Sequence, residues 1–375
     1  DFTGAALTLS GSGNTVGGAF EVTNAGVFTT SDSSDIVVSS TFVQNGGGSN
    51  TIGDDITATS IEFATGVTLT SGTGSDEIVF TSGGGAGQDI TFSQTLDNAD
   101  DELVKFNAGA SGDVTVTGAV GAFGTGDITI VNAANVLFSS TVSADDFIQT
   151  AGTGTTTITG AASLDIFNVT TTGNITAANA ANDFTGLVSA SNAGGTTIEL
   201  EDANSIQTGV ITAAGAGTVD ITATAIDVTQ NITAGSIFLT ASGGRDIDFG
   251  DGLATLGTNE FDLTDAEVSR LVESVSINLD TTGQVFFDQN VSETSLLVGQ
   301  RATPSLVQLA GTVTTTGVVT VDATTITIPG AGDISAGDAV SLTATNISTA
   351  GDVTTTNDNV TFTGAVVLTG NVAVN

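Results

Sequence analysis

The chain has 375 residues, of which 41 are acidic and four are basic, so its formal net charge is -37. It contains no cysteine and no histidine, which excludes disulfides, zinc–thiolate sites, thiol catalysis and histidine as a general base. Nucleic acids and anionic membrane surfaces attract lysine and arginine, so both are excluded as partners. Because 39% of the residues are hydrophobic and Thr, Val and Ile favour strands, we expect a folded, all-β protein.

Short stretches in which polar and apolar residues alternate run through most of the chain. Examples are DVTVTGAV (113–120), DITIV (127–131), TTTITG (155–160) and VVTVDATTITI (318–328). Gly, Asn or Asp residues that suit tight turns bound each stretch, so the pattern predicts many short strands. No stretch of 18 apolar residues occurs, so we expect no membrane insertion.

Internal repeats favour a solenoid over a sandwich or a barrel. NITAGSIFLTAS (231–242) recurs as DISAGDAVSLTAT (333–345), and DFTGAALTLS (1–10) recurs as DFTGLVSASN (183–192). A common spacing of roughly 20 residues suits one coil of a parallel β-helix, which predicts about 18 coils. Phe is the one aromatic residue type present, with 19 copies, and we expect these side chains to stack inside the coils.

One region departs from this pattern and divides the chain. We expect β-solenoid repeats over 1–242 and 306–375, and an irregular insertion over 243–305 that is continuous with the rod. Within the insertion, residues 264–273 are predicted to form a short helix. Thr264 and Glu267 fit the spacing of a capping box at its start.

Several longer phrases give the chain a family likeness. It resembles the β-helical repeat regions of filamentous-haemagglutinin-like giant surface proteins of Gram-negative bacteria. The phrases that carry the resemblance are ANDFTGLVSASN (181–192), EDANSIQTGVITAAG (201–215), GQDITFSQTLDNADDELVKFNAG (87–109) and FDLTDAEVSRLVESVSINLDTTGQV (261–285). The resemblance implies a right-handed parallel β-helix, secretion, display on the cell surface, and adhesion or cell–cell contact.

The expected function is therefore mechanical, and the chain is not expected to be an enzyme. It would be an extracellular stalk or fibre, a segment of a larger protein, in contact with copies of itself or with a neighbouring surface protein or polysaccharide. A second hypothesis is a self-assembling protomer of a filament or surface layer that depends on calcium. A third is a carbohydrate-active β-helix enzyme, which mutation of Asp246 and Asp248 would test.

Calcium is the cofactor that the acidic residues suggest, because it prefers hard carboxylate oxygens. Asp246, Asp248 and Asp251 fall within six residues of GGRDIDFGDG (243–252). Asp246 and Asp248 share a face if this segment is a strand. Asp76 and Asp89 lie in two segments that resemble calcium-binding nonapeptide repeats, SGTGSDEIV (71–79) and GGAGQDITF (84–92). We therefore predict calcium ligands at these five aspartates, with a solvated acidic edge as the alternative.

Adjacent aspartates are a different case. Asp54–Asp55, Asp100–Asp101 and Asp145–Asp146 are neighbouring pairs. Neighbours in a strand point to opposite faces, so such pairs do not form an acid/base couple. We expect them to be solvated at turns.

Overall fold

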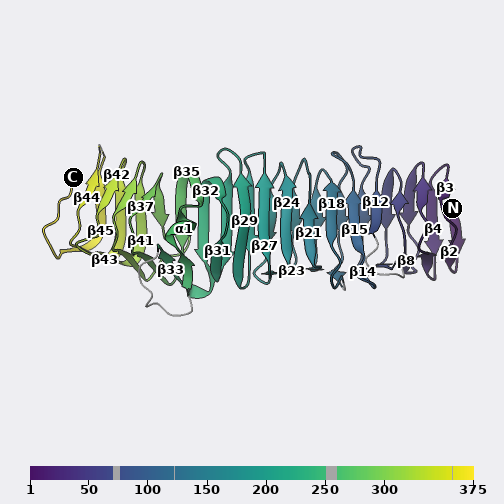
Figure 1. Cartoon of the computed structure of the whole chain (residues 1–375), viewed down its shortest axis with the longest axis horizontal. Helices are drawn as coiled ribbons and strands as arrows, with labels where there is room; N and C mark the ends of the chain where they lie inside the picture. Colours follow the sequence, from purple (N-terminus) through teal and green to yellow (C-terminus); the bar gives the residue numbers. More distant parts are fainter. Residues whose placement is uncertain (71–76, 122, 251–259, 357) are drawn as a thin grey trace. The chain divides into compact units, whose positions relative to one another are not determined.

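The computed structural model describes residues 1–70, 77–121, 123–250, 260–356 and 358–375. About 56% of the chain is strand and 2% is helix, which confirms an all-β protein. Among the described residues the strand pairings are parallel, and most strands pair with one about 20 residues further along, as Ile36 does with Ile56 and Val136 with Thr156. Longer spacings occur where a coil is extended, as between Ile61 and Ile90 and between Ile232 and Leu271. The fold is a parallel β-solenoid (Figure 1), as the repeat spacing predicts. Its handedness stays a prediction.

The chain divides into two compact units, Asp1–Gly194 and Gly195–Asn375. In the first unit each coil contributes one strand to each of three ladders, in the order ladder 1, ladder 2, ladder 3. Ladder 1 consists of β1 (Phe2–Gly4), β4 (Phe20–Asn24), β7 (Thr41–Gln44), β10 (Ser60–Phe63), β13 (Ile90–Phe92), β16 (Val114–Val116), β19 (Val136–Phe138), β22 (Thr156–Ile158) and β25 (Ile175–Ala178). Ladder 2 consists of β2 (Leu7–Leu9), β5 (Phe28–Thr30), β8 (Asn50–Ile52), β11 (Val67–Leu69), β14 (Leu96–Asn98), β17 (Val120–Gly121), β20 (Val142–Ser143), β23 (Ala162–Leu164) and β26 (Asp183–Phe184). Ladder 3 consists of β3 (Asn14–Val16), β6 (Ile36–Val38), β9 (Ile56–Thr57), β12 (Glu77–Thr81), β15 (Leu103–Asn107), β18 (Ile128–Asn132), β21 (Asp146–Gln149), β24 (Ile166–Thr171) and β27 (Leu187–Asn192).

The second unit has longer strands, several of which turn a corner and take part in two ladders. In β41, for example, Val319 pairs with Leu296 of β38, whereas Thr325 pairs with Leu306 of β39. Its strands are β28 (Thr197–Glu201), β29 (Ser205–Ala213), β30 (Thr218–Ala223), β31 (Ala225–Val228), β32 (Ile232–Ala241), β33 (Asp246–Phe249), β34 (Glu260–Leu263), β35 (Leu271–Asp280), β36 (Gln284–Phe287), β37 (Val291–Glu293), β38 (Leu296–Val298), β39 (Leu306–Leu309), β40 (Val313–Thr315), β41 (Val319–Ile328), β42 (Ile334–Ala336), β43 (Val340–Thr349), β44 (Val353–Thr355) and β45 (Val360–Leu368).

Such corners can require glycine. Gly364 turns the corner within β45 at a φ of 130°, and a Cβ atom there would lie 1.7 Å from the carbonyl oxygen of Ala344. No side chain fits so close an approach, so the coil spacing itself selects glycine at this position.

The interior is made by the alternating apolar residues, which point inward on every coil while their polar neighbours point outward. Phenylalanines stack from coil to coil as predicted. Phe63 and Phe92 are register partners with ring centroids 5.1 Å apart, and Phe80 and Phe106 are partners 5.7 Å apart. The parallel ladders repeat each inward position one coil later, so two phenylalanines meet wherever successive coils both carry one at that position.

The predicted helix over 264–273 is correct at its start and wrong in its extent. Helix α1 spans Asp265–Val268, and Thr264 and Glu267 form the predicted capping box. Leu271 already lies in β35, where it pairs with Ile232 and is buried. Pairing with β32 gives the backbone of Leu271 its hydrogen bonds and buries the side chain. These contributions outweigh the helical preference of the local sequence. The described part of the predicted insertion carries β33 to β38, and the boundaries at 243 and 305 remain predictions.

Candidate functional site

Three of the five predicted calcium ligands lie in the described residues. Asp246 and Asp248 lie on β33 and alternate with the buried Ile247 and Phe249, so they share the outward face of that strand. Asp246 Oδ1 accepts a hydrogen bond from the backbone N–H of Gln284 at 2.7 Å. Asp248 is buried although it faces outward. Asp76 and Asp251 lie outside the described residues, and calcium binding stays a prediction.

Asp89, the third described ligand, belongs to a chain of side-chain bonds between coils. Its Oδ1 accepts from the backbone N–H of Asp113 at 2.9 Å. Asp113 Oδ1 in turn accepts from the N–H of Asn135 at 2.9 Å, and Asn135 Oδ1 from the N–H of Thr155 at 3.0 Å. The second unit repeats the arrangement, with Asp333 accepting from Asp352, which accepts from Ala373. Several acidic side chains therefore accept a hydrogen bond from a backbone N–H group of the next coil. These N–H groups lie at corners between strands, where the β-ladder does not supply an acceptor.

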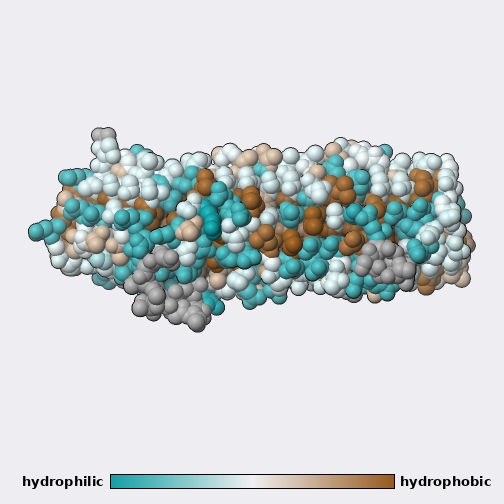
Figure 2. Space-filling model, viewed as in Figure 1, coloured by the Kyte–Doolittle hydropathy of each residue, from teal (hydrophilic) through white to brown (hydrophobic). Residues whose placement is uncertain are grey.

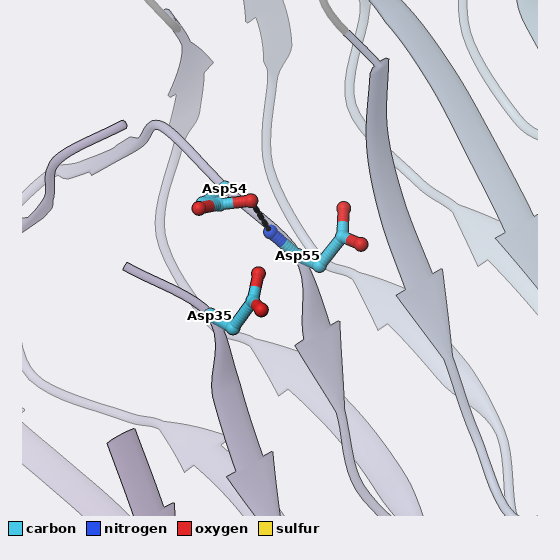
Figure 3. A group of neighbouring side chains, drawn as sticks. All are labelled: Asp35, Asp54 and Asp55. Carbon is cyan, nitrogen blue, oxygen red and sulfur yellow. Dashed lines mark hydrogen bonds between the residues drawn. The ribbon is translucent and has the colours of Figure 1, made fainter. Parts of the chain in front are cut away.

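The structure brings a third aspartate to two of the adjacent pairs. Carboxylate oxygens of Asp35, Asp54 and Asp55 all lie within 4.8 Å of one another (Figure 3). Register explains this, because Ile36 of β6 pairs with Ile56 of β9, which places Asp35 one coil before Asp55. Asp54 Oδ1 accepts from the N–H of Asp55 at 2.8 Å.

A second triad has the same construction. Asp127, Asp145 and Asp146 have carboxylate oxygens within 4.8 Å of one another. Ile128 of β18 pairs with Phe147 of β21, so Asp127 lies one coil before Asp146. Asp35 and Asp127 do not stand next to the adjacent pairs in the sequence and were not predicted to join them. Their spacing of about one coil from the pairs is the signal that would have found them.

Burial and like charge act together in both triads. Burial raises the pKa of Asp54 and of Asp55 above the ordinary value, and neighbouring aspartates raise each further. Burial likewise raises the pKa of Asp127 and of Asp146, and the charges of Asp145 and Asp127 respectively add to it. Both triads therefore destabilise their coils when they are fully ionised.

Arg301 is placed as a clamp that contacts the three preceding coils of the second unit. Its guanidinium pairs with Asp220 at 2.6 Å and lies 4.0 Å from the ring centroid of Phe238. Its backbone N–H donates to Oδ1 of the buried Asp280 at 2.8 Å. Elsewhere, Lys105 pairs with Glu77, and Arg270 donates to the backbone carbonyl of Val228. These three basic residues make contacts between coils, and none of them lies in a triad.

An open groove of about 570 Å³ lies beside α1. Its acidic lining residues are Asp265, Glu273 and Glu293. None of the three was predicted from the sequence to belong to a site. Burial raises the pKa of Glu293 to about 8, and the charge of Glu273 and a hydrogen bond to it contribute to the rise.

The surface offers scattered apolar side chains. On the face shown in Figure 2, hydrophobic residues lie mainly along the middle of the face, with hydrophilic residues among and around them. Exposed large apolar side chains among the described residues include Leu137, Leu187, Val210 and Val275. Isolated residues of this kind are ordinary on protein surfaces.

Comparison of the chain with models of protein families, with curated proteins and with solved structures finds no match. The β-solenoid fold agrees with the resemblance to filamentous-haemagglutinin-like repeats, while membership of that family stays a prediction. Among the described residues, no helix is long and apolar enough to cross a membrane.

Proposed function

We propose that the chain is an extracellular, structural or adhesive β-solenoid segment of a large bacterial surface protein, and that it acts as a stalk rather than as an enzyme. The parallel ladders that join consecutive coils in both units carry this proposal. A force applied along such a stack is shared by the backbone bonds of each coil interface, so the fold suits a load-bearing role.

Side-chain contacts between coils also support the proposal. Stacked phenylalanines tie neighbouring coils together inside, and corner aspartates and asparagines tie them together outside. These contacts stabilise the interfaces between coils, and stable coil interfaces are the property that a stalk needs.

Force spectroscopy tests the mechanical part. The whole chain is held between tags at its two ends and pulled, and we expect stepwise unfolding in multiples of about one coil of roughly 20 residues. Featureless extension at low force would contradict a load-bearing stalk. Incubation of the labelled chain with bacterial cells and purified surface polysaccharides then separates an adhesin, which binds, from a passive spacer, which does not.

A second candidate is a protomer that assembles when calcium screens its charge. The net charge of -37 and the two aspartate triads favour it, because both repel a second copy unless cations are present. Electron microscopy of the purified chain with calcium and with chelator tests this candidate. Fibres that require calcium would support it, and single particles in both buffers would eliminate it.

A further inference from the structure

Two consecutive coils of the second unit carry glutamate where other coils carry a small residue. The first part of β35 pairs with β32, whereas β37 pairs with β40, and β40 with β42. β37 contacts β35 and takes the corresponding place in this ladder one coil later. Leu271 and Val291 point inward in this ladder, and so does the row two residues further on. That row reads, coil by coil, Ala213, Ala234, Glu273, Glu293, Thr315 and Ala336.

An inward carboxyl is costly unless it is paired or neutral. Ala213, Ala234, Thr315 and Ala336 are buried at this row, whereas Glu273 and Glu293 are half-buried beside the groove. Two glutamates in successive positions of such a row therefore need a compensating arrangement.

Hydrogen bonds between the two coils provide that arrangement. Glu273 Oε1 accepts from the backbone N–H of Thr294 at 2.5 Å. Glu293 directly precedes Thr294 and lines the same groove as Glu273, so the two carboxyls meet at this coil interface. A hydrogen bond between two carboxyls requires one of them to keep its proton, and such a bond is among the causes that raise the pKa of Glu293. A side chain of β35 is thus bonded to the backbone of the next coil, beside the carboxyl of Glu293.

The surroundings keep the proton in place. Asp265 of α1 is the other titratable residue that lines the groove, and it is acidic. The residues that line the groove from the segment before β37, Gln289 and Asn290, are uncharged, as is Thr315 on the following coil. No basic residue lines the groove among the described residues, so ionisation of both glutamates would be unopposed.

We propose that Glu273 and Glu293 form a proton-dependent latch between the coils of β35 and β37. The latch is closed while the pair of glutamates holds one proton. Loss of this proton leaves two negative charges side by side, which weakens the closed state. The pKa of Glu293 in the closed coil is about 8, compared with an ordinary value of 4.5, so the closed coil binds this proton more tightly. The closed state is therefore favoured most below about pH 4.5, loses its advantage as the pH rises to about 8, and changes little above that. This latch does not depend on the proposed function.

Hydrogen exchange of the whole chain tests the latch. Protection of the segment 291–298, corrected for the intrinsic exchange rate, is measured between pH 5.5 and pH 8.5. In the unmodified chain we expect protection to fall at least about 10-fold over this range, since one proton gives up to about 10-fold per pH unit. Glu293→Gln keeps the shape and cannot ionise, so its protection should not change with pH.

Two further variants make the result specific. Glu273→Gln removes the negative neighbour and should reduce the pH dependence. Glu62→Gln, on the exposed outward face of β10, should leave it unchanged. Protection that is independent of pH in the unmodified chain, or equally dependent in Glu293→Gln, would overturn the proposal. If Glu293→Gln does not fold, carboxyl carbon NMR of the unmodified chain decides, because the latch requires one glutamate to titrate near pH 8.

Discussion

Replacing Phe92 with alanine removes a ring that contacts three other rings of the first unit. Phe92 is buried and lies within 5.1 Å of Phe63, 5.2 Å of Phe80 and 5.8 Å of Phe106, measured between ring centroids. Truncation of a buried phenylalanine costs about 3–5 kcal/mol through lost transfer free energy and the cavity left behind. Since three ring contacts are lost as well, we expect a value near 5 kcal/mol, because each aromatic pair contributes about 0.5–1.5 kcal/mol.

Urea unfolding followed by far-ultraviolet circular dichroism measures this loss. Phe92→Leu is the matched control, since it keeps most of the volume and should cost about 1.5 kcal/mol or less. Because coils interact mainly with their neighbours, the alanine variant should also unfold first around β13 and not in the second unit. A cost below about 2 kcal/mol for Phe92→Ala would refute the reasoning, as it would mean that the coils close over the cavity without loss.

Three further changes test other parts of the structure. Thr264→Ala removes the capping box of α1 and should lower local stability by about 1 kcal/mol, seen as faster hydrogen exchange over 264–270, whereas Thr264→Ser should preserve it. Asp54→Asn should raise the melting temperature at pH 7 and leave it unchanged at pH 3. The reason is that a carboxyl with a raised pKa destabilises the fold above that pKa and not below it. A higher melting temperature at both pH values would show that charge is not the cause. Arg301→Ala should lower the free energy of unfolding in urea by about 1 kcal/mol, because the contacts with Asp220 and Phe238 are lost. Arg301→Lys should recover part of this loss. Equal stability of Arg301→Ala and the unmodified chain would contradict the clamp.

Local features of the fold could be read from the sequence because they depend on near neighbours. Alternation over 113–120 and 318–328 specifies which residues of a strand face inward, and turn residues specify where it ends. The capping box of Thr264 and Glu267 is likewise a contact between residues three apart. A period of about 20 residues then implies parallel coils, and stacked phenylalanines follow from that period.

Features that depend on register could not be read in the same way. The helical pattern continues past Val268, but a strand partner at Ile232 draws Leu271 into β35. Asp35 joins Asp55 through the pairing of Ile36 with Ile56, and the coil lengths vary enough to hide this pairing. Degenerate repeats fix the period only on average, so the position of each residue relative to the next coil stays open until the ladders are known.

The sequence by itself determined the fold class and the inward stacking of the aromatic residues, because composition and period-two alternation act within each coil. The tertiary structure alone decided which residues meet between coils. It placed Glu273 beside Glu293, Asp127 beside Asp146, and Arg301 over Phe238. The physical reason is that the number of residues in each corner determines which residues of successive coils lie side by side. The backbone ladders and the buried side chains together set that number.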